Sequence, residues 1–590
     1  MSLLSKLTSS LHKHPSYWLA AILILAFGLR LYKLDAYGIF LDEKYTMVIS
    51  QGIVMDGANQ KDVFLQPTFT PQDFWKPKTL QDFFEANARG DIGNSPVYYA
   101  VVYSWMRVFG LSDFQARFPS VIFSVLIVGL MFVIVRRFYQ SNTLALLSAF
   151  LVAIEPFFVA YSHQARNYSM SFFLTLWATY LFLRIIENEN KNQPSTHLYV
   201  LYALSVSLSL LSHFLTFTVF VGHGLYVLLF LRKWQGWARL AVAVGVGLIP
   251  MILWMTVGAG QWTLSNLEDQ AQIYKKVAQT NPTNNPFGEV LPATLANVSQ
   301  KALPMFGDLF LFSNGLYQLE GKRNTLVAIL VGLLLTGLYA FSQRNAFLKR
   351  WDWALGFGLV GVSLLFYSQT PLLFGVLSGA VVLFYIMGEG LMKAFPQSRL
   401  TWFMLIMALI PNLFLVFWSF RNGHTYGLTQ RYGGFSFPYS VTLVSLTLLQ
   451  LFKTQNKIKY LIYGLLMIQL GAVALVLKSI YEDRSPKYTY FGTPRQPNPY
   501  YEAAQKIKQL YEEGDTIKYP TEPKVFLTEN ARTYLPYSLQ DAQLTNLYLP
   551  KDARYIQQID TTELSKIILI KAKNGQKVLL YDLEGKKHRY

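Results

Sequence analysis

Apolar runs of membrane-spanning length recur along this chain and constrain its fold more than any other feature. A transmembrane helix needs roughly 17–25 mostly apolar residues to cross about 30 Å of hydrocarbon. Hydrophobic residues make up 52% of the 590 residues and charged residues only 15%, whereas soluble domains average about 25% charged residues. A water-soluble fold is therefore excluded. We count thirteen candidate spans, at approximately 17–34, 118–135, 143–161, 168–186, 198–212, 214–231, 240–257, 325–341, 353–367, 372–391, 401–419, 437–452 and 458–480.

Two apolar stretches need a decision before these spans can be oriented. The stretch 198–231 would be about 50 Å long as one helix, so we expect a break at His213. The run 96–110 carries Arg107 and many aromatic residues, and we expect it to lie in the membrane interface without crossing. The first run lacks a small-residue cleavage site, so we expect an anchor rather than a signal peptide.

The distribution of Lys and Arg orients the chain. With the N-terminus in the cytoplasm, the inside segments hold the basic clusters, including Arg136 with Arg137 and Lys349 with Arg350. The short outside loops hold only Arg166, Arg421 and Arg431. This asymmetry predicts a cytoplasmic N-terminus and an external C-terminal segment. It also accounts for most of the net charge of +18 without a nucleic-acid partner.

The predicted domains follow from this orientation. Residues 1–480 form a transmembrane domain, with large outside regions at 35–117 and 258–324, and residues 481–590 form a separate outside domain. The last region contains a helical pattern at 500–513 and strand-like runs at 524–528, 566–571 and 577–583, which predict a small α/β domain. The expected fold class is an all-α polytopic membrane protein with a small external α/β domain.

The first candidate site is the sequence Asp42-Glu43-Lys44, directly outside the first span. Adjacent carboxylates at a membrane surface favour a pKa shift through burial and mutual repulsion, and such a shift suits a general base. An acidic pair alone also fits an ordinary solvated loop. The apolar residues on both sides of this pair favour an ordered position at the start of a helix.

Two further polar clusters lie on the same predicted side of the membrane. The turn after the third span contains His163, Gln164, Arg166, Asn167 and Tyr168, and polar residues at membrane depth are usually paired or functional. A later loop contains cationic and aromatic residues, and Arg presents a planar fork that matches phosphate oxygens. This loop therefore suits an anionic lipid head group, although it also fits nonspecific contact with anionic lipid. Its candidate residues are Arg421, His424, Arg431 and Tyr432.

These motifs, in this order, resemble the polytopic GT-C-type glycosyltransferases, which include the protein O-mannosyltransferases and the aminoarabinose and rhizobial lipopolysaccharide transferases. The resemblance covers about 17–254, with a weaker match at 430–438. It rests on Asp42-Glu43, on Ser-Pro-Val-Tyr-Tyr at 95–99, on the segments at 109–112 and 116–120, on Ser-His-Gln-Ala-Arg-Asn-Tyr-Ser at 162–169 and on His213 in a Ser-His-Phe turn. In this chain Gln164 stands where the family has Glu, and Asn-Ser precedes Pro96 where several branches have His-Pro or Lys.

The resemblance implies a GT-C fold and transfer of a sugar from a polyprenyl phosphate to a lipid, glycan or protein acceptor outside the membrane, usually with inversion. It implies that Asp42 deprotonates the acceptor hydroxyl and that Glu43 assists or orients. Arg166, Arg431 and His424, with Tyr432 beside them, would neutralise the departing lipid phosphate. The other predicted site-lining residues are Lys44, His163, Gln164, Asn167, Tyr168, His213 and Arg421.

Other features restrict the chemistry further. The chain has no Cys, which excludes disulfides, thiolate metal sites and a Cys nucleophile. It has no Walker loop or nucleotide-sugar motif, so we expect no nucleotide donor. Asp42, Glu43 and His163 supply oxygen and nitrogen ligands for a divalent metal, but no ligand spacing identifies a site, and we assign no cofactor.

Two alternative functions stay open at this level. A transporter or flippase of a lipid-linked or anionic substrate would also have many spans with polar turns, but transport sites usually lie near the membrane midplane. A noncatalytic scaffold would leave the acidic and cationic clusters unexplained. The basic, Cys-free, polytopic chain suits a bacterial inner membrane, with the 481–590 domain in the periplasm.

Overall fold

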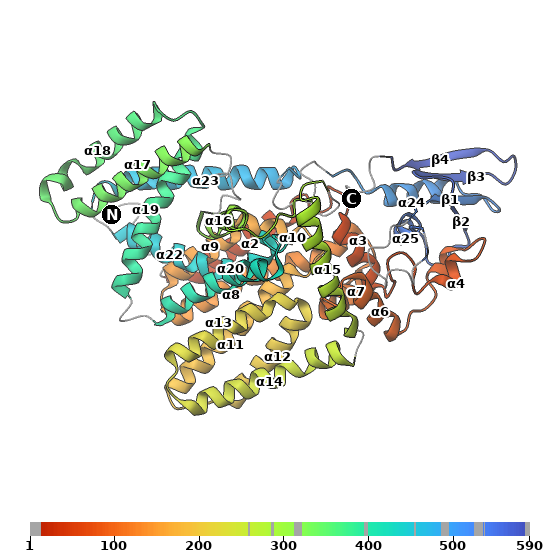
Figure 1. The fold of residues 1–590 in the computed structure, drawn as a ribbon, viewed down its shortest axis with the longest axis horizontal. Coiled ribbons are helices and arrows are strands. Elements are labelled where there is room, and N and C mark those ends of the chain that lie inside the picture. The colour runs from red at the N-terminus through yellow and green to blue at the C-terminus, as the bar shows by residue number, and fades with distance from the viewer. Residues whose placement is uncertain are drawn as a thin grey trace.

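A long helical part and a small sheet domain at one end make up the chain (Figure 1). The computed structural model describes residues 13–257, 260–284, 288–311, 321–394, 399–453, 456–484, 495–523, 535 and 537–584. The main helices are α2 (Pro15–Leu31), α8 (Asp113–Tyr139), α9 (Asn142–Ile154), α10 (Pro156–Ser162), α11 (Tyr168–Asn190), α12 (Thr196–Ser212), η1 (Phe214–Thr216), α13 (Phe217–Phe230), α14 (Trp234–Thr256), α17 (Lys322–Ser342), α18 (Ala346–Leu364), α19 (Pro371–Ala394), α20 (Arg399–Asn422), α22 (Phe437–Lys453) and α23 (Lys459–Tyr481).

Every expected span coincides with a helix or a bent helix pair, which confirms an integral membrane protein of the predicted class. Among the described residues, eight helices are long and apolar enough to cross a membrane, or nine if α9 and α10, bent by 53°, form one span. Three further apolar helices, α2, α12 and η1 with α13, are shorter. The predicted count of thirteen stays a prediction. The expected break at His213 is confirmed, because α12 ends at Ser212 and His213 has an extended backbone.

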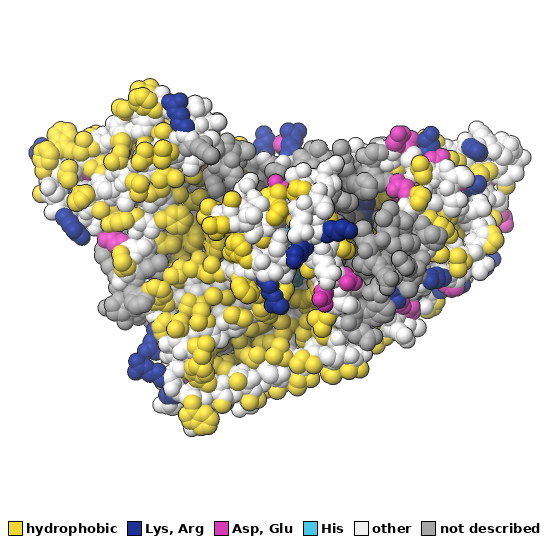
Figure 2. All heavy atoms as spheres, viewed as in Figure 1, with side chains coloured by type: hydrophobic (Ala, Val, Ile, Leu, Met, Phe, Trp, Pro, Cys, Tyr) yellow, Lys and Arg dark blue, Asp and Glu magenta, His cyan; other side chains and the backbone are white. Residues whose placement is uncertain are grey.

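The surface of the helical part matches a hydrocarbon environment. Helix α14 exposes Val242, Val246, Ile249 and Leu253, each at least half exposed, and this helical spacing places them on one face. Hydrophobic side chains cover much of the helical part in Figure 2, whereas the visible acidic side chains gather toward the sheet domain. Apolar faces of this extent are stable in lipid but not in water.

Further helices lie in the two large regions that were predicted to be outside the membrane. The first contains α3 (Leu41–Ser50), α4 (Lys61–Phe64), α5 (Pro71–Phe74), α6 (Leu80–Gly90) and α7 (Pro96–Phe109), and the second contains α15 (Gln261–Thr280) and α16 (Leu295–Leu311). Thr79 is the N-cap residue of α6 and forms a capping box with Asp82. This arrangement satisfies free N–H groups of the first turn. Helix α7 has Pro96 in its first turn and ends at Gly110, so the predicted helix at 96–110 is confirmed.

The C-terminal domain is a four-stranded sheet with two helices. Its elements are α24 (Pro499–Leu510), β1 (Thr516–Pro520), α25 (Gln540–Asn546), β2 (Ile556–Asp560), β3 (Lys566–Ile570) and β4 (Lys577–Asp582). The strand order is β2-β1-β3-β4, with β1 and β2 parallel and the other pairs antiparallel. The predicted helix and the last two strands are confirmed, whereas the predicted strand at 524–528 lies outside the described residues.

This domain does not stand apart from the first outside region. Met47 and Val48 of α3 belong to the same buried cluster as Ala542 and Leu544 of α25. The side chain of Gln543 also donates to the carbonyl of Val54, 3.1 Å away. The shared core fixes helix α3, which carries the predicted acidic pair, between the C-terminal domain and the helical part.

Candidate active site

Asp42 and Glu43 occupy the first turn of helix α3 and point in different directions. The backbone N–H of Phe40 donates to Glu43 Oε2 at 3.1 Å, and this contact starts the helix at Leu41. Glu43 is fully buried, whereas the Asp42 side chain is 22% exposed. A helix N-terminus favours negative charge, so both carboxylates are stabilised there. Only Asp42 is available to a ligand.

Asp42 is paired with a cation from a distant part of the chain. Arg431, in the short helix α21 (Gln430–Gly433) that η3 (Gly434–Ser436) follows, places Nη1 3.3 Å from Asp42 Oδ2. Its guanidinium also lies over the Tyr432 ring, with 5.1 Å to the centroid. The Arg431 side chain is 19% exposed. A partly open carboxylate thus lies beside a partly open guanidinium.

Arg166 forms the second cationic side of this site. Its Nη1 contacts the Asp42 carbonyl at 3.4 Å and the Tyr99 hydroxyl at 3.2 Å, and its Nη2 lies 3.3 Å from Asp91 Oδ1. Tyr99 donates to Asp91 Oδ2 at 2.7 Å. The buried Nε of Arg166 has no partner among the described residues, and a buried unpaired donor is an exception that calls for a functional reason.

Asp91 is a site residue that the sequence analysis missed. Burial raises the pKa of Asp91, the attraction and hydrogen bonding of Arg166 and Tyr99 oppose that shift, and the charge of Asp42 adds to it. Its position depends on a strained turn, because the non-glycine residues Ile92 and Ser95 have φ angles of +56° and +84°. Such angles cost about 1–3 kcal/mol each and cluster at functional sites.

Contacts from other elements hold that turn in place. Trp254 of α14 donates through Nε1 to the Gly93 carbonyl at 2.8 Å. The Asn94 side chain accepts from the backbone N–H of Phe214 at 3.2 Å. Gly93 has a φ of +66°, and a Cβ there would lie 2.3 Å from the hydroxyl of Thr263. The signal in the sequence is the Gly-Asp-Ile-Gly-Asn run before Pro96, which is typical of a tight turn.

Glu43 is held by two arginines and two backbone N–H groups. Arg117 binds both of its oxygens at 2.8 Å, and the N–H of Ala165 donates at 2.7 Å. Arg495 adds a contact of 3.2 Å and is itself held by Asp483, which follows the last helix of the transmembrane part. Burial favours the neutral form of Glu43, but the charge and hydrogen bonds of Arg117, with Arg495, outweigh it and lower the Glu43 pKa.

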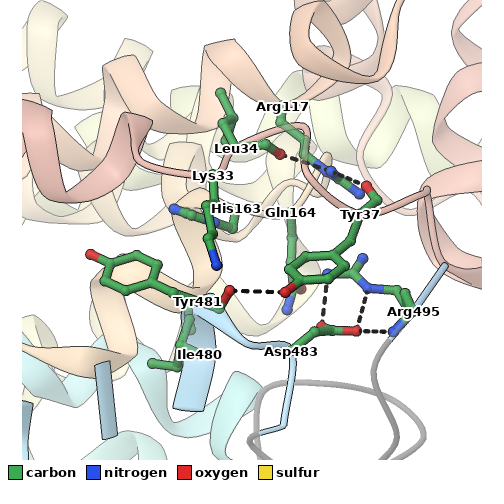
Figure 3. Close-up of a pocket in the computed structure, with 11 residues that line it drawn as sticks. Lys33, Leu34, Tyr37, Arg117, His163, Gln164, Ile480, Tyr481, Asp483 and Arg495 are labelled. Atoms are coloured by element: carbon green, nitrogen blue, oxygen red, sulfur yellow. Dashed lines mark hydrogen bonds and ion pairs between the residues drawn. The ribbon is translucent and has the colours of Figure 1, made fainter. Parts of the chain in front are cut away.

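Glu43, Arg117, Arg495 and Asp483 form a clasp, and the last three of these residues also line a small cavity. Figure 3 shows Arg117 reaching the carbonyls of Leu34 and Tyr37, and Arg495 paired with Asp483. Arg117 and Arg495, which are far apart in the sequence, both hold the start of α3 through Glu43. These contacts direct the Glu43 carboxylate away from Arg431 and hold the start of the helix that carries Asp42, and the role of assisting or orienting Asp42 stays a prediction.

The polar turn at 163–168 is divided between the clasp and the site. His163 and Gln164 line the cavity in Figure 3, where burial and the charges of Arg117 and Arg495 lower the pKa of His163 to about 3. Asn167 donates to the hydroxyl of Ser95 and to the Ser212 carbonyl. Tyr168 is buried against Tyr161 and His213. From this turn, only Arg166 directly contacts the backbone of Asp42 through a hydrogen bond.

The two other predicted histidines, His213 and His424, lie in different surroundings. His213 packs against Tyr432, and burial with the charges of Arg166 and Arg431 lowers its pKa to about 3, which keeps it neutral. His424 is buried beside Tyr274, and burial lowers its pKa. No contact in the described part of the chain joins His424 to Asp42 or Arg431.

Two predicted site-lining residues face elsewhere. The Lys44 ammonium lies over the ring of Tyr500, 5.5 Å from its centroid, in the C-terminal domain. This orientation follows from helix geometry, because Lys44 projects from another side of α3 than Asp42. Arg421 is exposed and stacks on Trp418 at 4.9 Å. Both side chains thus make these contacts away from the Asp42–Arg431 pair, and their place in the lining of the site stays a prediction.

A metal site is not formed by the acidic pair. Asp42 faces Arg431, whereas Glu43 belongs to the clasp and His163 lines the cavity beside it. Among the residues that the structure describes, no three carboxylate or imidazole groups are placed to hold a metal ion. The groups that meet at Asp42 are its carboxylate, the guanidinium groups of Arg431 and Arg166, and the Tyr99 hydroxyl that binds Arg166.

The family comparison agrees with the sequence resemblance. Residues 94–258 match the model of the dolichyl-phosphate-mannose-protein mannosyltransferase family. This stretch includes the Asp91 turn's C-terminal end, helix α7 and the turn that carries Arg166. It confirms the resemblance to the polytopic glycosyltransferases over these residues. No curated protein matches the chain.

Solved structures of similar shape include two membrane glycosyltransferases. The oligosaccharyltransferase of Archaeoglobus fulgidus, in complex with zinc and sulfate, is 16% identical, with a TM-score of 0.41 over 84% of this chain and 56% of that chain. ArnT from Cupriavidus metallidurans in the apo state is 13% identical, with a TM-score of 0.38 over 93% and 86% of the two chains. The structure of the same ArnT bound to undecaprenyl phosphate is 14% identical, with a TM-score of 0.35 over 92% of this chain and 86% of that chain. The chain thus spans 56% of the archaeal protein's length, and TM-scores below 0.5 are too low to carry a functional conclusion.

Proposed function

We propose that this protein is a membrane glycosyltransferase that moves a sugar from a polyprenyl-phosphate-linked donor to a hydroxyl group of a lipid, glycan or protein acceptor. The observation that carries the proposal is the juxtaposition of Asp42 and Arg431, 3.3 Å apart and both partly open. The family match over residues 94–258 supports a lipid-phosphate donor.

The geometry assigns a role to each charged group. Asp42 accepts the proton of the acceptor hydroxyl as its oxygen forms a bond to the anomeric carbon of the sugar. The bond from that carbon to the phosphate oxygen breaks, and its electron pair leaves with the polyprenyl phosphate. Attack opposite the leaving group inverts the anomeric centre. Arg431 and Arg166 stabilise the negative charge that grows on the phosphate, which is commonly the largest catalytic contribution.

Neighbouring residues prepare these groups without reacting. Asp91 and Tyr99 hold Arg166 beside the Asp42 backbone. Glu43 fixes the start of α3 through Arg117 and Arg495. His213 is neutral beside Tyr432, so it contributes no positive charge to the binding of the donor phosphate. His424 lies in the loop between α20 and α21 and packs against Tyr274.

The proposal includes the membrane orientation and the domain division. Lys and Arg clusters at the opposite helix ends support a cytoplasmic N-terminus and a reaction on the outer face. Residues 1–480 would then form the transferase domain and residues 481–590 an external domain that holds α3 and borders the acceptor side. A bacterial inner membrane, with this domain in the periplasm, fits the Cys-free chain.

Donor binding tests the proposal directly. We expect a sugar on polyprenyl phosphate to raise the melting temperature of the full chain in an uncharged detergent, because a ligand of the folded state stabilises it. Nucleotide sugars serve as controls and should have no effect. Arg431→Gln should reduce the shift and Asp42→Asn should retain it. A shift with nucleotide sugars and none with the prenyl-linked sugar would contradict the proposal.

A further inference from the structure

Helix α7 presents three different faces around its axis. Its buried face carries Tyr98, Tyr99, Val102 and Met106, and Tyr99 reaches the active site. A second face contributes Ala100, Tyr103 and Ser104 to a cavity. A third face contributes Val97, Val101, Trp105 and Val108 to an open groove. Ala100 and Ser104 line both the cavity and the groove, so the two spaces adjoin each other along one helix.

The cavity is cationic and large enough for a ligand group. It has a volume of about 400 Å³ and lies between α3, α6, α7 and the C-terminal domain. Ligand pockets commonly range over about 300–1,000 Å³. Its charged lining residues are Lys76, Lys78 and Lys551, and no described lining residue is acidic. Lys551 lies over the Trp75 ring at 4.2 Å, which brings a lysine of the C-terminal domain to the first outside region.

Nearby carboxylates do not neutralise all three lysines. Lys76 pairs with Asp62 at 3.6 Å and Asp73 at 3.8 Å. Asp73 and Asp82 also close capping boxes at the starts of α5 and α6. Lys78 and Lys551 form no ion pair within the described part of the chain. Burial lowers the pKa of Lys78 against the opposing charges of Asp82 and Asp62, so an anion in the cavity would stabilise its charged form.

The groove beside the cavity is apolar and faces outward. Val108 and Phe109 are 74% and 54% exposed, and Trp105 stacks between Phe109 and Phe118. Exposed apolar and aromatic residues at the end of a helix are typical of the membrane interface. A cationic cavity beside an apolar groove matches a molecule with an anionic head and a hydrocarbon chain.

We infer that this cavity and groove bind the acceptor, and that the acceptor is an anionic lipid whose charged head lies among Lys78, Lys551 and Tyr103 while its chain follows α7. This inference rests on the proposed transferase function. Ser50 and Gln51, which border the cavity, are on the same helix as Asp42, about 12 Å along the axis. The head group must therefore be long enough, such as a short glycan, to bring a hydroxyl from the lysines to Asp42.

The test compares wild type with the double variant Lys78→Gln/Lys551→Gln. A matched control is Lys566→Gln/Lys577→Gln, which removes two exposed lysines of the C-terminal sheet that border neither space. Short-chain phosphatidic acid, phosphatidylcholine and inorganic phosphate are titrated against the full chain in uncharged detergent, with melting temperature as the readout. Transfer of labelled sugar from the prenyl donor to a membrane lipid extract is measured in parallel, after mild acid removes unreacted donor.

We expect phosphatidic acid to bind wild type and the control at least ten-fold more tightly than either other probe, and the double variant to lose about ten-fold in that affinity. The double variant should raise the KM for the lipid extract about ten-fold and retain the melting shift with the prenyl-linked sugar. Equal binding of phosphatidic acid by all three proteins would overturn the site. Lost binding with an unchanged KM would assign the cavity to bilayer phospholipid and overturn the acceptor role. A wild type that neither binds nor uses the donor would instead refute the proposed transferase function, while the lipid titration would still decide whether the site exists.

Discussion

Arg431 and Asp42 are 389 positions apart in the sequence, yet Nη1 of the first lies 3.3 Å from Oδ2 of the second. Asp42 lies in the first turn of helix α3, and Arg431 lies in α21, shortly before α22. The pair joins the N-terminal and C-terminal parts of the transmembrane domain at one point. A carboxylate, the proposed base, and a guanidinium, the proposed phosphate-binding group, are adjacent there.

Replacing Arg431 with Gln should weaken donor use by about 10- to 100-fold, because a hydrogen bond between charged groups contributes roughly 1.5–3 kcal/mol. The measurement is the KM for the prenyl-linked donor together with the donor-induced melting shift. Arg421→Gln is the matched control, since Arg421 is an exposed arginine that stacks on Trp418 at the end of α20, where the loop toward α21 begins. Equal losses in the two variants would show that the loop's general charge, and not the Arg431 contact, binds the donor.

Tyr99→Phe should reduce kcat about ten-fold and leave the melting temperature nearly unchanged. The Tyr99 hydroxyl donates to Asp91 at 2.7 Å and accepts a hydrogen bond from Arg166. Loss of this hydroxyl therefore frees the Arg166 guanidinium to shift from its place beside Asp42. Steady-state rates at saturating donor check this expectation. Tyr501→Phe, which changes an exposed tyrosine of the C-terminal domain, should have no effect. Full activity of Tyr99→Phe would remove Tyr99 from the positioning of Arg166.

Glu43→Gln should destabilise the protein at neutral pH, because it removes the carboxylate shared by the buried Arg117 and the partly buried Arg495. Breaking a buried ion pair by removing one partner costs about 3–5 kcal/mol. Since the Glu43 pKa in the folded state is lowered from its ordinary value of 4.5, its stabilising contribution is present above that pH and is lost as the pH falls toward the lower value.

Melting temperatures of wild type and Glu43→Gln between pH 7 and pH 3 measure this contribution. The gap between the two proteins should be largest near pH 7 and should narrow below about pH 4. Glu513→Gln, at an exposed position, should follow wild type throughout. A gap that stays constant over the whole range would mean that the charge of Glu43 does not stabilise the clasp.

The helices were predictable from the sequence because hydrocarbon thickness fixes the length of an apolar run. The break at His213 followed from the same rule. The strands β1 and β2 were not predicted, since Thr516–Pro520 and Ile556–Asp560 are short and carry polar residues on one face. The two segments form strands because they pair with each other, and neither sequence alone specifies a strand.

The site was predictable at the level of residue types but not of directions. Asp42 and Arg431 were both predicted, while their contact depends on how α21 and α3 pack. Lys44 and Glu43 follow Asp42 directly, and the turn of the helix sends each of them to a different neighbour. Asp91 escaped prediction because its role comes from Arg166 and Tyr99, which reach it across the fold, and from a strained turn that the surrounding helices hold.

The central claim is that Asp42 acts as the base in sugar transfer, and single-turnover transfer by Asp42→Asn tests it most directly. Because the amide keeps the shape of the side chain but cannot take the proton, we expect the rate to fall about 10²- to 10⁴-fold, with the donor-induced melting shift preserved. Asp552→Asn, at an exposed position of the C-terminal domain, should react at the wild-type rate. Normal single-turnover transfer by Asp42→Asn would contradict the account.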